Sequence, residues 1–165
     1  MLLRFKESCK FDLDGWSIPY YKTQHSSRFK FCVVRNPWDR LVSCYSDKVV
    51  RKILFEECWD QDFSFFIRWC CTQNLDTADI HIRRQTALFP ADEIDYIAKF
   101  ENFSHEFNYI MNERLGLGVE ILNKNTSEHK HYSTYYTDET RALVADLYAS
   151  DVQVGNYTFE NKSNS

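Results

Sequence analysis

Residues 29–49 read FKFCVVRNPWDRLVSCYSDKV, and this stretch decides the fold. From Phe29 to Val34 the sequence is nearly continuously apolar and β-prone, which is typical of a strand buried on both faces of a parallel sheet. Asn36 and Pro37 follow as an N-cap and a first-turn proline, so a helix is expected to begin there. The sequence therefore predicts a strand, a tight turn and a helix in direct succession.

The same alternation continues along the chain. We expect a second helix at about 62–72, a short strand at 95–100, a helix capped by Ser104 that runs through Leu115, and a last helix capped by Thr137. Strands that alternate with helices indicate an α/β fold with a largely parallel sheet flanked by helices. The sequence has no internal repeat and no Pro/Gly-rich linker, so residues 1–165 are expected to form a single domain.

The composition excludes several classes of protein. The chain is 44% hydrophobic and 16% aromatic, which is enough to bury a sizeable core. A net charge of −4 disfavours non-specific binding to nucleic acid or to anionic membranes. The apolar runs are far shorter than the roughly 20 residues of a membrane span, so none is predicted. Six cysteines without zinc-ligand spacing indicate buried thiols.

Arg35 stands at the position where such a fold binds ligands. Ligands of parallel sheets lie beyond the carboxyl ends of the strands, where helix N-termini point free backbone N–H groups outward. A guanidinium there can hold a phosphate through two hydrogen bonds, and the hydroxyl of Ser43, two turns into the helix, can donate nearby. The alternative is that Arg35 pairs with Asp39 or Asp47 and that Ser43 is an ordinary helix serine.

The whole stretch of residues 29–49 resembles the 3′-phosphate-binding segment of carbohydrate sulfotransferases, including the chondroitin and heparan sulfate families. Three further stretches resemble the same family in the same order, and together they extend the resemblance to about residues 29–159: HIRRQTALFP, DYIAKFENFSHEF and NKNTSEHKHYSTYYTDETRALVADLYASDVQVGNYTF. The resemblance implies a P-loop-like sulfotransferase fold. It also implies transfer of a sulfuryl group from 3′-phosphoadenosine 5′-phosphosulfate (PAPS) to a hydroxyl of a carbohydrate acceptor.

The resemblance also assigns site residues. Arg35 and Ser43 would bind the 3′-phosphate of PAPS. Sulfuryl transfer needs neutralisation of the leaving phosphate and a base for the acceptor hydroxyl, and it does not demand a metal, which agrees with the lack of a metal-ligand pattern. His81, inside the family-like HIRRQ stretch, is the candidate catalytic base, ahead of His25. The alternative is that His81 orients a loop together with Gln85.

Three other side chains bear on the site. Glu101 also matches the family and is either structural or directed into the site. His129 and His131 lie in a polar, lysine-containing loop and are expected to be solvated rather than to bind a metal.

One part of the family pattern is missing from the sequence. A Pro-Lys-x-x-x-Thr-like loop normally wraps the 5′-phosphosulfate, and no such strand, loop and helix occur before Phe29. We therefore expect an N-terminally incomplete domain, a loop supplied by another chain, or a domain that binds adenosine 3′,5′-bisphosphate or a partner without turnover. The missing strand would leave an exposed sheet edge that an oligomer can cover.

A P-loop kinase is disfavoured because the chain has no G-x-x-x-x-G-K-S/T string. The sequence does not identify the cellular compartment. A bacterial-type enzyme would be in the cytoplasm, and a eukaryotic carbohydrate sulfotransferase would be in the Golgi lumen.

Overall fold

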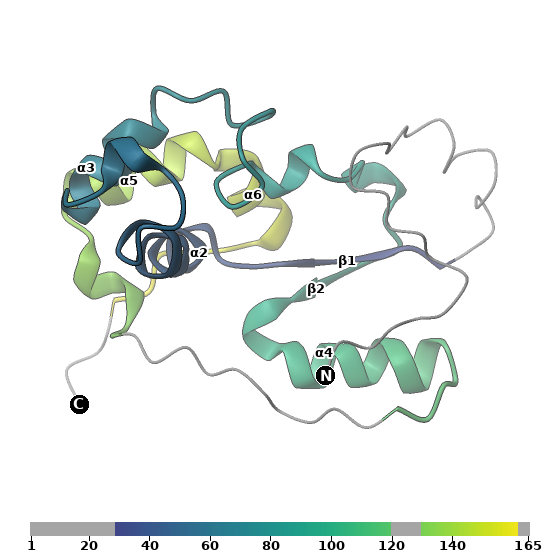
Figure 1. Ribbon diagram of the computed structural model, residues 1–165. Coiled ribbons are helices and arrows are strands. Elements are labelled where there is room, and N and C mark those ends of the chain that lie inside the picture. The colour runs from purple at the N-terminus through teal and green to yellow at the C-terminus, as the bar shows by residue number, and fades with distance from the viewer. Residues whose placement is uncertain (1–28, 120–129, 162–165) are drawn as a thin grey trace.

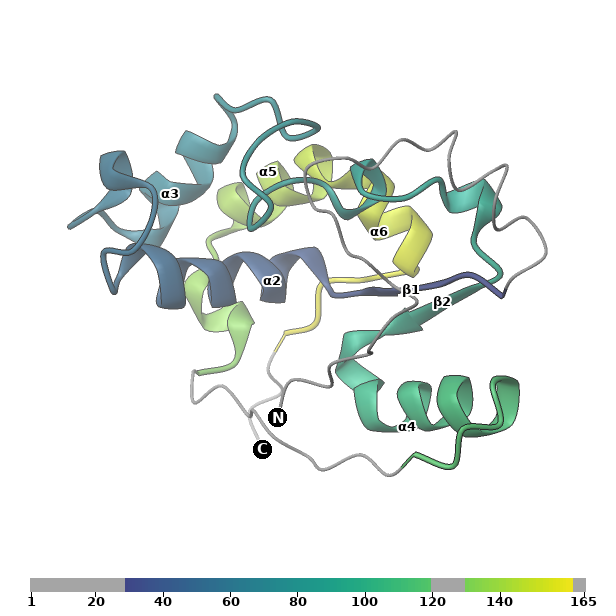
Figure 2. The same cartoon turned by 45° about the vertical axis from the view of Figure 1, so that its right-hand side comes forward.

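The computed structural model describes residues 29–119 and 130–161 (Figures 1 and 2). Its described strands form a two-stranded parallel sheet of β1 (Phe31–Val34) and β2 (Tyr96–Lys99). The register pairs Phe31 with Tyr96 and Val34 with Lys99. Both strands therefore end at the same edge of the sheet, which is where an α/β protein places its ligands.

Helices surround this sheet and make up the rest of the regular structure, in agreement with the α/β class expected from the sequence. The α-helices are α2 (Pro37–Cys44), α3 (Phe63–Cys70), α4 (Phe103–Asn108), α5 (Asp138–Leu147) and α6 (Ala149–Gly155). Two π-helical stretches continue α2 and α4, namely η1 (Tyr45–Val49) and η6 (Tyr109–Arg114). Short 3-10 turns are η2 (Glu56–Cys58), η3 (Gln85–Ala87), η4 (Ala91–Glu93), η5 (Phe100–Asn102) and η7 (Tyr132–Tyr135). No described helix is both long and apolar enough to span a bilayer.

The start of α2 is the one that the sequence predicts. The side chain of Asn36 accepts a hydrogen bond from the Trp38 N–H at 3.0 Å, and Pro37 occupies the first turn. This cap satisfies a backbone donor that the helix itself leaves unpaired. The chain therefore turns from strand to helix within two residues, Arg35 and Asn36.

The predicted cap of α5 is confirmed, whereas the predicted cap of α4 is wrong. Thr137 caps α5 and forms a capping box with Thr140. In contrast, α4 begins at Phe103 with Asn102 in the N-cap position, so Ser104 lies inside the first turn. The chain enters α4 directly from the 3-10 turn η5, which already has helical curvature and moves the start of the helix ahead of the serine.

Each face of the sheet packs against a different set of elements. Phe31, Tyr96 and Ala98 pack with η6, whereas Val34 and Ile97 belong to the larger core formed with α2, α3 and α5. Figures 1 and 2 show α4 on one side of the strands and α5 and α6 on the other.

β1 is less buried than its apolar run predicts. Only Val34 of this strand is fully buried, and Val33 is 38% exposed. Among the described residues, β1 has a strand on one side only. Three cysteines are buried in the larger core as free thiols, as the sequence indicates: Cys44, Cys58 and Cys70. Cys32 is only partly buried, and Cys71 is exposed, against the expectation.

Candidate functional site

The turn between β1 and α2 is held by the side chain of Gln85, which comes from the HIRRQ stretch. Its Oε1 accepts a hydrogen bond from the Arg35 N–H at 2.9 Å, and its Nε2 donates one to the Arg35 carbonyl at 2.9 Å. Gln85 is buried, with 8% of its surface exposed. Both backbone groups of Arg35 are therefore satisfied by one amide, away from water.

Glu101 and Tyr157 hold the same turn from another side. One carboxylate oxygen of Glu101 accepts a hydrogen bond from the Asn36 N–H at 2.6 Å. The hydroxyl of Tyr157 lies 3.0 Å from both the Val34 carbonyl and the second oxygen of Glu101, so its hydrogen is shared between them. Burial, and then the charge of Glu101, raise the pKa of Tyr157 well above its ordinary value, which keeps this hydroxyl protonated. Glu101 is thus a structural residue at the edge of the site.

Asp151, on α6, supports Gln85 from behind. Its carboxylate accepts hydrogen bonds from the Gln85 N–H at 2.8 Å, the Thr86 N–H at 2.9 Å and the Thr86 hydroxyl at 2.8 Å. Asp151 is only 2% exposed, and these donors compensate for removing its charge from water. The contacts connect α6 to Gln85 and, through Gln85, to Arg35.

The guanidinium of Arg35 pairs with Asp39, one of the two partners that the sequence offered. Asp39 Oδ2 accepts a hydrogen bond from Arg35 Nε at 2.8 Å and lies 2.7 Å from Nη2. The ring of Phe100, which directly follows β2, lies 4.9 Å from the guanidinium carbon. Asp47 pairs instead with Arg51, at 2.7 Å, and with Lys48, at 2.8 Å. Arg35 Nη1 makes no hydrogen bond within the described residues, so one edge of this largely buried guanidinium keeps its donors unpaired there.

Ser43 lies on the same side of α2 as Asp39. Residues four apart face the same way on an α-helix and are about 6 Å apart along its axis. The Ser43 side chain is partly buried, and its hydroxyl makes no hydrogen bond to the rest of the described chain. Arg35, Asp39 and Ser43 therefore follow one another at intervals of four residues, from just before α2 to its last turn.

His81 lies in a turn beside α2 and pairs with Asp79. Its Nδ1 lies 2.7 Å from Asp79 Oδ1, and the His81 side chain is 38% exposed. Within the described part of the chain it forms no hydrogen bond or ion pair with Arg35, Ser43 or Gln85. The structure therefore places His81 in an accessible His–Asp pair rather than in the group that holds the turn.

The other candidate histidines do not join this site. His25 and His129 lie outside the described residues. His131 is half-buried rather than solvated, because its ring stacks on Tyr132 and its Nδ1 hydrogen-bonds the Ser133 hydroxyl at 2.9 Å. Within the described ranges, residues 29–119 and 130–161, no group of three or more histidine, cysteine, aspartate or glutamate side chains is arranged to hold a metal ion.

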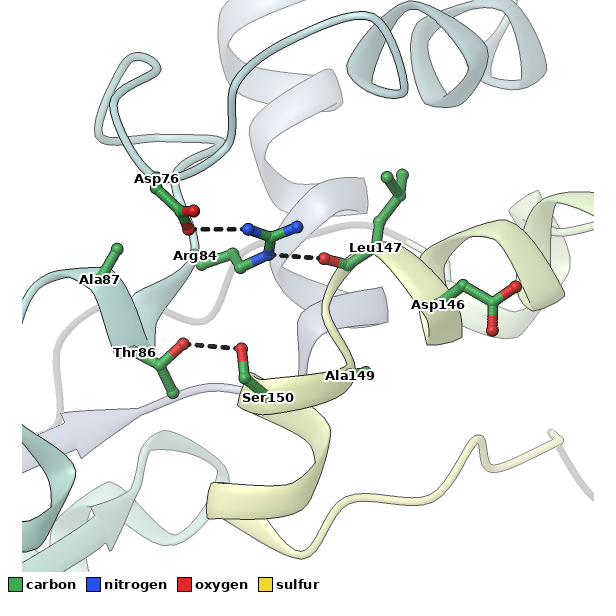
Figure 3. A pocket seen from close by; sticks show the side chains of 8 residues that line it. All are labelled: Asp76, Arg84, Thr86, Ala87, Asp146, Leu147, Ala149 and Ser150. Carbon is green, nitrogen blue, oxygen red and sulfur yellow. Dashed lines mark hydrogen bonds and ion pairs between the residues drawn. The ribbon is translucent and has the colours of Figure 1, made fainter.

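A depression of about 570 Å³ lies next to the Gln85 segment, between residues 84–87 and the junction of α5 with α6. In Figure 3, dashed lines join Arg84 to Asp76 and Leu147, and Thr86 to Ser150. Arg84 donates to the Leu147 carbonyl at 2.8 Å and to Asp76 at 2.7 Å, and the Thr86 and Ser150 hydroxyls are 2.8 Å apart. These contacts fasten the Gln85 segment to the C-terminal helices.

Sequence reasoning missed the side chains that hold the turn. It offers Gln85 only as a partner of His81, and it does not single out Asp151, Tyr157 or Phe100. Gln85 and Phe100 do lie inside family-like stretches, next to His81 and Glu101, and this position is the only signal that the sequence contains. The hydrogen bonds of Gln85, Asp151 and Tyr157 at this turn span 50 or more positions along the chain, so no local pattern reveals them.

Comparison with known proteins identifies the family of this chain. No curated protein and no solved structure matches the chain. The model of the sulfotransferase family matches residues 11–158, which is most of the chain and includes the β1–α2 unit, the Gln85 segment and Tyr157. Members of this family are transferases that move sulfuryl groups. The resemblance to sulfotransferases is therefore confirmed at the level of the family, and the chain belongs to the sulfotransferase family.

Proposed function

We propose that this protein transfers a sulfuryl group from PAPS to a hydroxyl of a carbohydrate, and that the β1–α2 turn holds the donor's 3′-phosphate. The observation that carries the proposal is Arg35, which has both backbone groups fixed by Gln85 and one edge of its guanidinium unpaired within the described chain. In this P-loop-like arrangement the phosphate would meet a cation beside the positive end of α2, an eight-residue helix.

The residues present fit a phosphate. A guanidinium binds phosphate through two parallel N–H···O bonds, and such charge-assisted bonds contribute about 1.5–3 kcal/mol each. In the proposed complex, Arg35 supplies this edge and Ser43 donates its hydroxyl from one turn beyond Asp39. The 3′-phosphate distinguishes PAPS from ordinary nucleotides, so these contacts would select the donor.

His81 is the proposed general base. With Asp79 accepting from Nδ1–H, the Nε2 atom is left as the acceptor for a proton. In the reaction, the acceptor hydroxyl oxygen forms a bond to sulfur while its proton moves to Nε2. The bond from sulfur to the bridging oxygen breaks, and adenosine 3′,5′-bisphosphate leaves. The exposure of His81 leaves room for a bulky carbohydrate.

The donor site is tested by calorimetric titration with adenosine 3′,5′-bisphosphate. Arg35→Ala should weaken binding by about 2 kcal/mol or more, because it removes a charge-assisted contact. Ser43→Ala should have a smaller effect. Arg51→Ala is the matched control, since Arg51 is an exposed arginine that follows α2 and pairs with Asp47. Equal affinity of the wild-type and Arg35→Ala proteins would show that the site is elsewhere.

The reaction is tested by transfer of radiolabelled sulfate from PAPS to a panel of glycans. We expect transfer by the wild-type protein and strong loss in His81→Ala, with bisphosphate binding retained. Binding without transfer to any acceptor would favour a domain that binds the bisphosphate without turnover. Full transfer by His81→Ala would exclude His81 as the base.

A further inference from the structure

Asp39 occupies only one of the edges through which Arg35 can bind an anion. A guanidinium carries five N–H donors in a flat fork. A single oxygen of Asp39 takes the side edge, at 2.8 Å from Nε and 2.7 Å from Nη2. The outer edge, formed by Nη1 and the second hydrogen of Nη2, makes no hydrogen bond to the described chain. The pairing therefore leaves the donors of the outer edge without a partner in the described chain, on a side chain that is 19% exposed.

The remaining freedom of Arg35 is also restricted. The ring of Phe100 lies against the guanidinium at 4.9 Å, and Gln85 fixes the backbone of Arg35. Of the three contacts, only the one with Asp39 sets the rotation of the guanidinium within its own plane, because the Phe100 ring allows sliding across its face. The direction of the outer edge thus depends on Asp39.

We infer that Asp39 is a positioning residue of the donor site, which aims the outer edge of Arg35 at the 3′-phosphate and stays paired with Arg35 while the donor is bound. The inference rests on the proposed function and adds a residue to it. It implies that the carboxylate helps an anionic ligand to bind, although both carry negative charge.

The geometry of the ion pair favours a positioning role for Asp39 over competition between its carboxylate and the phosphate. A carboxylate that stood in the place of the phosphate would cover the outer edge, where a flat anion makes two parallel bonds. Asp39 instead uses one oxygen on the side edge, and its attachment to α2 four residues after Arg35 keeps it there. Arginine is long and rich in rotamers, so an anchored guanidinium loses less entropy when the phosphate binds.

The test compares Asp39→Asn and Asp39→Ala with the wild-type protein, using adenosine 3′,5′-bisphosphate and adenosine 5′-monophosphate as ligands in calorimetry. Asp39→Ala should bind the bisphosphate about tenfold more weakly, a change of ~1.4 kcal/mol, and Asp39→Asn should lose less. Affinity for the monophosphate, which has no 3′-phosphate, should stay the same. Asp39→Glu should recover part of the lost affinity, since it restores a carboxylate for Arg35.

Asp47→Asn is the matched control, because it removes the same charge from η1, directly after α2, where the carboxylate pairs with Arg51. It should leave both affinities unchanged. Melting temperatures are measured in parallel, and the nearly isosteric Asp39→Asn carries the test if Asp39→Ala is unstable. A general loss of folding would lower both affinities, whereas lost positioning lowers only that for the bisphosphate.

Two results would overturn the inference while leaving the proposed function in place. Tighter binding of the bisphosphate by Asp39→Asn would show that Asp39 competes with the phosphate. Unchanged binding by both variants would show that Arg35 needs no anchor. If the wild-type protein does not bind the bisphosphate at all, the proposed donor site fails first and the inference falls with it.

Discussion

The side-chain amide of Gln85 pairs with Arg35 as a neighbouring strand would. It accepts from the Arg35 N–H and donates to the Arg35 carbonyl, each at 2.9 Å. In an antiparallel sheet, the two residues of a hydrogen-bonded pair exchange the same two bonds. The amide therefore satisfies the backbone just beyond the end of β1, where pairing with β2 has stopped at Val34.

Replacing Gln85 with leucine should lower both stability and affinity for the bisphosphate. Leucine fills a similar volume but leaves the N–H and the carbonyl of Arg35 without partners, which should reduce the free energy of unfolding by about 2 kcal/mol or more. Urea denaturation and calorimetric titration measure the two effects. Gln153→Leu, at an exposed position of α6, is the control and should change neither. A Gln85→Leu protein as stable as the control would contradict this account of the turn.

Asp151→Asn should destabilise the protein although it changes few atoms. An asparagine presents an NH₂ group where the carboxylate accepts from Gln85 and Thr86, so one buried donor must face another donor. The expected loss in the free energy of unfolding is about 1–3 kcal/mol. Thermal and urea denaturation of Asp151→Asn and of Asp146→Asn, an exposed aspartate of α5, provide the comparison. Equal stability of the two variants would argue against a supporting role for Asp151.

Tyr157→Phe should loosen the turn without changing its packing. The variant removes the hydroxyl that lies 3.0 Å from the Val34 carbonyl and from Glu101, at an expected loss of about 1 kcal/mol in the free energy of unfolding. Amide hydrogen exchange should show faster exchange at residues 34–36. Tyr135→Phe is the matched control, because the Tyr135 hydroxyl makes no hydrogen bond within the described residues. If the amides of residues 34–36 exchange equally slowly in Tyr157→Phe and Tyr135→Phe, the hydroxyl of Tyr157 does not have this role.

A substitution at Gly155 should act on Tyr157 through packing. A Cβ at this position would lie 2.1 Å from Cε2 of the Tyr157 ring, closer than any real contact. Gly155→Ala must therefore displace the ring or the end of α6, and it should destabilise the protein by about 1–3 kcal/mol. Urea denaturation of Gly155→Ala beside Gly118→Ala separates the clash from a general effect of losing a glycine. Gly118 has open space around it but a positive φ of 59°, so its alanine variant should show only backbone strain.

Stability should fall in alkali, and Tyr148 should account for part of the loss. Tyr148 is fully buried and donates to the Ile82 carbonyl at 2.6 Å, and burial raises its pKa far above its ordinary value. The unfolded chain ionises this phenol as pH rises through about 10 while the folded chain does not. The contribution of Tyr148 is therefore complete below pH ~10 and is lost above it, by about 1.4 kcal/mol per unit of pH.

Tyr148→Phe isolates this contribution. At pH 8 the variant should be less stable than the wild-type protein by about 1 kcal/mol, because it lacks the hydrogen bond. The other buried tyrosines and thiols are common to both proteins, so their titration cancels in the comparison. Urea denaturation between pH 8 and 11 should show the difference shrinking as pH rises. A difference that stays constant over this range would contradict the linkage.

The amino-acid sequence by itself determined the elements that depend on neighbours along the chain. The apolar run that ends at Val34, the cap at Asn36 and the proline at Pro37 act within one turn of backbone, so the sequence alone locates β1 and α2. The same holds for the capping box of Thr137 with Thr140. The position of Arg35 between strand and helix follows from these local rules, whereas its candidate role in binding phosphate came from the resemblance to sulfotransferases.

Only the tertiary structure decided what holds that site in place. Gln85 reaches Arg35 across 50 residues, Glu101 reaches Asn36 across 65, and Tyr157 reaches Val34 across 123. The sequence also left Asp39 and Asp47 as equal partners for Arg35, and the folded geometry selected Asp39. Hydrogen bonds form between groups that folding brings within about 3 Å, and this distance is set by the packing of whole elements rather than by spacing along the chain.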